Sequence, residues 1–215
     1  MPSSIYLDNN ATTPLAPEIA QQLAELYGSH IANPASQHRL GRSALALLEQ
    51  AKTEVLELVG APCQGMDTAN IVLTSGGTEA NNLAIHGICM GRPGVIIVGA
   101  TEHPSVPAAA NLPGLQHHPL RTLPVDSQGR CDLDQLQDWL KSIYAGTDPA
   151  ADQVALVSIM MGNNETGILQ DLPTICAICN QYGVPVHSDV VQAVGKTPVH
   201  MLDMGLSALT LTAHK

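Results

Sequence analysis

The chain has 215 residues, which suits one large domain or one and a half small ones, and 45% of them are hydrophobic, which excludes a disordered chain. Aromatic residues make up only 2% and Phe is absent, so an aliphatic core is expected. The formal net charge of -10 argues against nucleic acid or an anionic membrane as partner, because both select basic patches.

The N-terminal residues lack a basic stretch followed by an apolar one, so no signal peptide is expected, and no 18-residue apolar run predicts a membrane span. The odd count of cysteines favours reduced thiols in a cytoplasmic protein. Cys176 and Cys179 have the spacing of a redox or half metal site. Because they fall inside a predicted helix and have no second Cys/His pair, two packed core thiols are favoured, and the same interpretation applies to Cys63, Cys89 and Cys131.

The predicted elements alternate between helix and strand from residue 70 onward. Apolar residues at helical spacing, with proline near the starts and glycine at the ends, predict helices at 17–27, 40–59, 78–91, 104–110, 132–144 and 172–182. Short apolar runs predict strands at 71–73, 95–98, 120–125, 154–160, 184–187 and 206–212. This alternation predicts an α/β fold with a mostly parallel or mixed sheet and helices on both faces.

A lysine and an aspartate follow two of these strands. Lys215 lies three residues past the strand at 206–212, and Asp189 lies two residues past the one at 184–187. Ligand chemistry in open α/β sheets gathers at the carboxyl ends of strands, and a pyridoxal phosphate site needs this pair. The lysine amine forms a Schiff base, and the carboxylate keeps the pyridine nitrogen protonated. The alternatives are a solvated lysine and a helix-capping aspartate.

Three further polar segments follow strands. Glycines in Thr74–Ala80 let backbone amides approach an anion at a helix N-terminus, although an ordinary turn is the alternative. His103 is placed to stack on an aromatic cofactor, or is a surface histidine at a helix start. The amides of Asn163 and Asn164 are placed to bond a ring hydroxyl, or form an Asn-rich turn.

Seven segments, taken in order, span nearly the whole chain: Tyr6–Pro14, Asn33–Ser36, Thr74–Glu79, Thr101–His103, Val157–Met160 with Asn163–Glu165, His187–Asp189 with Gln192, and Ala213–Lys215. Together they resemble the cysteine desulfurases, which belong to the class V aminotransferase group of fold-type I pyridoxal phosphate enzymes. Thr212 and Ala213 depart mildly from the family, which more often has a serine first in that pair.

The resemblance implies a role for each matching residue. Lys215 would carry the Schiff base and move the alpha proton, and His103, the second catalytic residue, would stack over the ring. Asp189 would pair with the pyridinium nitrogen and Gln192 with the ring hydroxyl. Asn164 would contact the side of the ring or the substrate carboxylate.

The remaining implied contacts are to the phosphate and the substrate. Gly77, Thr78, Thr212 and His214 would hold the phosphate, and Asn33 would lie near the substrate carboxylate. No metal is implied. The reaction would remove sulfur from L-cysteine, giving L-alanine and an enzyme persulfide for iron–sulfur cluster assembly. A homodimer, and an iron–sulfur scaffold or sulfur-acceptor protein as partner, are expected with it.

The resemblance also implies that the sequence covers only part of the family's length. Residues 1–15 would be an N-terminal arm and 16–215 a pyridoxal phosphate-binding large domain. The family's small C-terminal domain, persulfide cysteine and substrate-binding arginine come after the lysine. The alternatives are another class V enzyme, such as a selenocysteine lyase or an aminotransferase, and a non-catalytic fragment.

Overall fold

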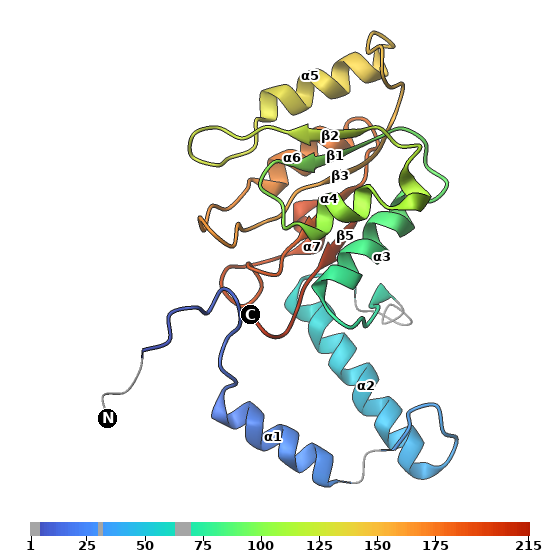
Figure 1. The fold of residues 1–215 in the computed structure, drawn as a ribbon. Helices are drawn as coiled ribbons and strands as arrows, with labels where there is room; N and C mark the ends of the chain where they lie inside the picture. The colour runs from blue at the N-terminus through green and yellow to red at the C-terminus, as the bar shows by residue number, and fades with distance from the viewer. Residues whose placement is uncertain (1–4, 30–31, 63–69) are drawn as a thin grey trace. The chain divides into compact units, whose positions relative to one another are not determined.

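The computed structural model describes residues 5–29, 32–62 and 70–215 (Figure 1). They divide into two compact units. Unit 1 contains the described residues up to Val72 together with Ala213–Lys215, and unit 2 contains Leu73–Thr212. Helices or strands of the expected kind occupy most of the predicted ranges.

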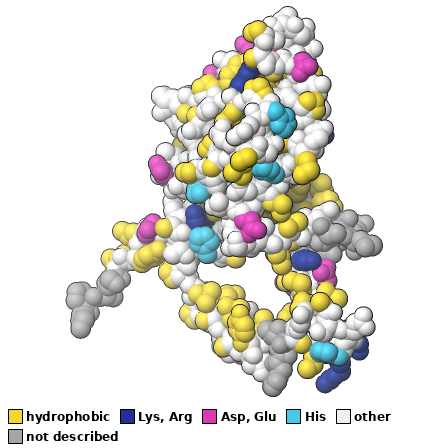
Figure 2. Space-filling model, turned by 45° about the vertical axis from the view of Figure 1, so that its right-hand side comes forward, with side chains coloured by type: hydrophobic (Ala, Val, Ile, Leu, Met, Phe, Trp, Pro, Cys, Tyr) yellow, Lys and Arg dark blue, Asp and Glu magenta, His cyan; other side chains and the backbone are white. Residues whose placement is uncertain are grey.

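Unit 1 is built on two helices, α1 (Pro17–Gly28) and α2 (Arg39–Leu58). Pro17 stands at the first helical position of α1, where its missing N–H is not needed. The Nδ1 atom of His38 accepts a hydrogen bond from the backbone N–H of Gly41 and caps α2. Both helices expose apolar side chains, which appear yellow in Figure 2; large exposed ones are Ile19, Leu23, Tyr27, Leu40, Leu45, Leu47 and Leu58.

Unit 2 is built on a five-stranded sheet in which every neighbouring pair is parallel. The strands are β1 (Val95–Gly99), β2 (Leu120–Leu123), β3 (Val154–Ser158), β4 (Val186–Asp189) and β5 (Ala208–Thr210), in the spatial order β2-β1-β3-β4-β5. All residues of β1 and β3 are buried, as expected for central strands whose two faces are both covered.

The helices cover both faces of this sheet (Figure 1). They are α3 (Gly77–Cys89), α4 (Ser105–Ala110), the short 3-10 helix η2 (Pro113–Leu115), α5 (Leu133–Tyr144), α6 (Leu172–Asn180) and α7 (Met201–Met204). The chain moves one way along the sheet from β1 to β2 and the other way from β2 to β5. Right-handed crossovers therefore put α4 on one face and α5, α6 and α7 on the other. Helix α3 packs against α4 and covers the same face.

The α/β class and the two-sided helical cover are confirmed, and several details of the predicted elements are corrected. Residues 71–73 form no strand, because no neighbouring strand pairs with them, and Val72 and Leu73 are 64% and 66% exposed. The last two strands are shorter or shifted, at 186–189 and 208–210. Helix α7 falls within the long connection before β5, for which the sequence pattern predicts no element.

Candidate functional site

The order of the strands creates a reversal point between β1 and β3. One connection leaves β1 toward β2, while the chain after β3 proceeds to β4 on the other side. In open α/β sheets such a reversal leaves a crevice outside the carboxyl ends of the strands, where ligands bind. The segments that follow β1 and β3 are joined here, because Asn163 Nδ2 donates to the carbonyl of Thr101 at 3.0 Å.

Asp189 ends β4 and is 5% exposed. Its Oδ1 atom accepts a hydrogen bond from the backbone N–H of Val191 at 3.0 Å, and its Oδ2 atom accepts one from Asn81 Nδ2 at 2.9 Å. A donor therefore faces each oxygen, and the carboxylate is held in one orientation as a hydrogen-bond acceptor.

His103 follows β1 and is half-buried just before α4. Its Nδ1 atom lies 2.7 Å from Ser105 Oγ and accepts the backbone N–H of Ser105 at 3.2 Å. Ser105 Oγ also accepts a hydrogen bond from Asn81 Nδ2 at 2.9 Å. His103 and Asp189, predicted separately from sequence, are thus connected through two residues that the sequence analysis did not name.

Asn81 is not among the predicted site residues, although its position in the sequence indicates that it is buried. It lies four residues before Ile85 and eight before Cys89, so it occupies the buried face of α3. It is 1% exposed, and its Oδ1 atom accepts a hydrogen bond from Thr210 Oγ1. A buried amide has to find partners, so an asparagine at an apolar position of an amphipathic pattern marks a polar network.

The N-terminus of α3 is arranged to receive an anion. Its first backbone amides have no intrahelical acceptor, and the N-cap residue, Gly76, supplies no side chain to cap the helix. A Cβ atom added at Gly77 would lie 3.1 Å from Thr212 Cγ2, so this turn packs directly on the residue after β5. The Oγ1 atom of Thr212 is buried and has no hydrogen-bond partner. A phosphate group fits this donor set of amides and hydroxyl, to which the exposed Thr78 is adjacent.

Gln192 and Asn164 are both half-buried in unit 2, and their predicted ring contacts remain predictions. Lys196 Nζ donates to Gln192 Oε1 at 2.6 Å, one turn further along the chain. Asn164 directly follows Asn163, the residue that links the segments after β1 and β3.

The remaining predicted site residues lie in unit 1. The carbonyl of His214 accepts hydrogen bonds from Thr13 N at 2.8 Å and Thr12 Oγ1 at 3.1 Å, so the N-terminal loop holds the segment that carries Lys215. Lys215 is half-buried. Asn33 is exposed, and its side chain accepts the N–H of Ala35 in a turn. That these residues meet Asp189 remains a prediction.

Two buried ionisable groups accompany the site in unit 2. Burial raises the pKa of Glu102 to about 8; its Oε1 atom accepts the N–H of Met160 at 2.6 Å, while its Oε2 atom is buried without a partner. Burial lowers the pKa of His187 to about 4, and its Nδ1 atom lies 2.9 Å from Ser158 Oγ. Both groups are therefore held neutral at pH 7, which suits a dry interior.

The four described cysteines are buried in unit 2, and Cys63 lies outside the described residues. Burial raises the pKa of Cys89 and Cys176 to about 11, and that of Cys131 and Cys179 to about 12. The prediction of packed core thiols is confirmed for these four. In the ranges that the structure covers, no three His, Cys, Asp or Glu side chains gather as a metal site would require.

Comparisons with known proteins agree with this geometry. The sequence model of the family described as Aminotransferase class-V matches residues 5–215. A cysteine desulfurase of Sinorhizobium fredii is 36% identical over 98% of the chain and 52% of its own length. Cysteine desulfurase NifS of Azotobacter vinelandii is 33% identical over 99% of the chain and 50% of its own length. The chain spans about half the length of these curated relatives.

Solved structures give the same result. A NifS-like protein from Rickettsia africae superposes with a TM-score of 0.81 at 32% identity, over 98% of this chain and 54% of that one. SspA, solved in complex with cysteine, superposes with a TM-score of 0.83 at 26% identity, over 98% of this chain and 57% of that one. Within the described residues, no helix has the length and apolar character needed to cross a membrane.

Proposed function

Because the chain belongs to the aminotransferase class-V family, we propose that it forms the cofactor-binding part of a pyridoxal phosphate-dependent cysteine desulfurase. The observation that carries this proposal is the buried Asp189 carboxylate, held by two donors at the end of β4. A rigid buried acceptor of this kind is what keeps a pyridine nitrogen protonated. When bound, pyridoxal phosphate supplies the electron sink that allows the bond to the alpha proton of an amino acid to break.

Each residue of the site has a defined task under this proposal. Asp189 accepts the ring N–H, Gln192 and Asn164 contact the ring substituents, and His103 stacks on the ring face. Lys215 binds the cofactor and moves the alpha proton.

The phosphate and the substrate are held by the other residues. The amides of Gly77 and Thr78 bind the phosphate at the positive end of α3, together with Thr212 and His214. The buried, unpartnered Oγ1 atom of Thr212 supports this assignment, because an anion would satisfy it. Asn33 lies near the substrate carboxylate.

The proposed substrate is L-cysteine and the proposed carbon product is L-alanine, with sulfur passing to a thiolate. Relatives named cysteine desulfurase and a neighbour solved with cysteine support this choice. None of the four described cysteines is a suitable acceptor, because burial holds their pKa at about 11 to 12. We further propose a cytoplasmic homodimer that delivers sulfur to an acceptor or scaffold protein of iron–sulfur cluster assembly.

Borohydride trapping of the added cofactor tests the binding site. Reduction fixes pyridoxal phosphate on the lysine that holds it, and peptide mapping then identifies that lysine among Lys52, Lys141, Lys196 and Lys215. We expect the label on Lys215, with the visible absorbance of the imine lost in Lys215→Ala and kept in Lys196→Ala. Labelling of another lysine, or no uptake by the wild-type chain, would refute the proposed site.

The substrate is tested separately, with the chain saturated with pyridoxal phosphate and supplied with a dithiol reductant. Alanine and sulfide should form from L-cysteine in equal amounts, because the dithiol takes up the sulfur as a persulfide and is oxidised to a disulfide as it releases sulfide. Turnover of L-selenocysteine without turnover of L-cysteine would favour a selenocysteine lyase, and amino transfer to a keto acid would favour an aminotransferase.

A further inference from the structure

Asn81 joins three elements of unit 2 from a buried position on α3. Its Nδ2 atom donates to Asp189 Oδ2 on β4 and to Ser105 Oγ at the start of α4, both at 2.9 Å. Its Oδ1 atom accepts from Thr210 Oγ1 on β5. The two amide hydrogens and the carbonyl oxygen are therefore all used, and the side chain is 1% exposed.

These partners fix which way the amide faces. If the amide were rotated by half a turn, its oxygen would face the carboxylate oxygen of Asp189 and two acceptors would be in contact. Thr210 Oγ1, which can donate, instead faces the amide oxygen. The hydrogen bonds are therefore donated in one direction, from Thr210 to Asn81 and from Asn81 to Asp189. We call this fixed direction of donation the proton order.

The second amide hydrogen extends this order to His103. Ser105 Oγ accepts from Asn81, so its own hydrogen is free to point at His103 Nδ1, 2.7 Å away. The backbone N–H of Ser105 donates to the same nitrogen at 3.2 Å. Two donors face Nδ1, so this nitrogen is the acceptor and the ring proton belongs on Nε2.

From this network we infer that Asn81 is a positioning residue, which orients the Asp189 carboxylate and, through Ser105, fixes His103 as its Nε2–H tautomer. The inference rests on the proposed function, in which Asp189 and His103 contact the cofactor ring. One amide thereby sets the orientation of the acceptor for the ring nitrogen and of the imidazole that stacks on the ring.

The first experiment measures pyridoxal phosphate binding to Asn81→Ala. Loss of a hydrogen bond to a carboxylate should weaken binding about 10- to 100-fold. The matched control is Asn82→Ala, next along α3, whose side chain donates to the carbonyl of Thr78 one turn back. Circular dichroism checks that both variants fold. Unchanged affinity in a folded Asn81→Ala protein would overturn the positioning role.

The second experiment reads the histidine tautomer in the protein without cofactor. ¹⁵N NMR separates a protonated from an unprotonated ring nitrogen, and His103→Gln identifies the signals of His103. We expect Nε2–H in the wild type and in Ser105→Thr, which keeps the hydroxyl, and a mixture of tautomers in Ser105→Ala. A wild-type proton on Nδ1 would overturn the inferred order. Failure of the wild type to bind pyridoxal phosphate would count against the proposed function, while the NMR result would still decide the proton order.

Discussion

Two threonines near the end of β5 differ in whether their buried hydroxyl groups form a hydrogen bond. Thr210 is 4% exposed, and its hydroxyl donates to Asn81, so the group is satisfied inside the core. Thr212, two residues later, buries its Oγ1 atom without a partner. A buried hydroxyl that makes no hydrogen bond costs stability. The protein therefore carries at Thr212 an unfavourable group that an anion would satisfy.

Valine has nearly the same shape as threonine, so replacing Thr210 or Thr212 with valine tests the contribution of each hydroxyl group to stability. Thr212→Val should raise the free energy of unfolding without ligand by about 1 kcal/mol and weaken binding of pyridoxal phosphate. Thr210→Val should lower the free energy of unfolding by about 1–3 kcal/mol, because it leaves Asn81 Oδ1 unsatisfied. Urea denaturation measures both, and a destabilised Thr212→Val protein would show that the hydroxyl has a partner.

The sequence predicted individual site residues where a strand end coincided with a reactive side chain. Asp189 and His103 followed predicted strands, and the structure connects them by hydrogen bonds through Asn81. Asn81 itself was not predicted, because its partners come from residues 24, 108 and 129 positions away. Local pattern shows that a polar residue faces the core, but only the tertiary fold shows which groups it meets.

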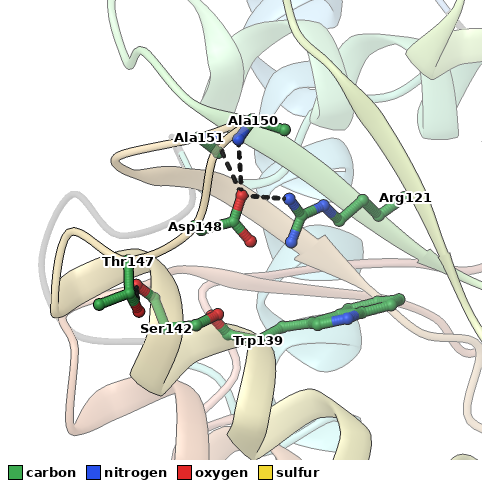
Figure 3. A network of polar contacts seen from close by, with 7 residues as sticks. All are labelled: Arg121, Trp139, Ser142, Thr147, Asp148, Ala150 and Ala151. Atoms are coloured by element: carbon green, nitrogen blue, oxygen red, sulfur yellow. Dashed lines mark hydrogen bonds and ion pairs between the residues drawn. The ribbon is translucent and has the colours of Figure 1, made fainter.

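At the scale of elements, the edge strand β2 is fastened to the loop after α5 (Figure 3). Arg121 Nη2 on β2 lies 2.7 Å from Asp148 Oδ1, and the Arg121 guanidinium lies 5.5 Å from the ring centre of Trp139 on α5. Asp148 Oδ1 also accepts the backbone N–H groups of Ala150 and Ala151. The hydrogen bond from Arg121 is the main cause that lowers the pKa of Asp148 to about 2.

Two substitutions at Asp148 separate the ion pair from the turn. Asp148→Asn keeps an oxygen for the N–H groups of Ala150 and Ala151 and removes only the charge, so its melting temperature should fall slightly. Asp148→Ala removes the acceptor as well, so its melting temperature should fall further, by several degrees. Thermal unfolding followed by circular dichroism measures the melting temperatures of the wild type and both variants. Equal melting temperatures for the two variants would show that the turn contributes nothing beyond the ion pair.

The central strands β1 and β3 are predictable from the sequence because their residues are buried on both faces of the sheet. The apolar runs at 95–98 and 154–160 were predicted as strands and form the fully buried strands β1 (Val95–Gly99) and β3 (Val154–Ser158), because an apolar run between turns suits a covered sheet. The apolar run at 71–73 looks the same locally but has no neighbouring strand, and it stays mostly exposed. A strand needs a partner, and composition alone does not supply one.

At the scale of the molecule, two buried groups in unit 2 give stability opposite dependences on pH. Glu102 has its pKa raised to about 8 in the folded state, so the folded protein holds a proton that the unfolded chain loses above its ordinary value of 4.5. Stability from this group falls as pH rises from 4.5 to about 8. His187 has its pKa lowered from 6.5 to about 4, so stability from this group falls as pH drops through that range.

The two slopes oppose each other between pH 4.5 and 6.5, and above pH 6.5 only the slope from Glu102 remains. Ionisation of Glu102 should therefore lower the free energy of unfolding by roughly 2 kcal/mol between pH 6.5 and 8. Trp139 is the single tryptophan and lies in unit 2, so its fluorescence in urea reports the unfolding of this unit alone. The difference in free energy of unfolding between the wild type and Glu102→Gln isolates the ionisation of Glu102, since glutamine keeps an acceptor for Met160 N. If that difference is flat between pH 5 and 8, Glu102 ionises normally in the folded protein; if it declines as pH rises, the buried carboxyl keeps its proton at neutral pH.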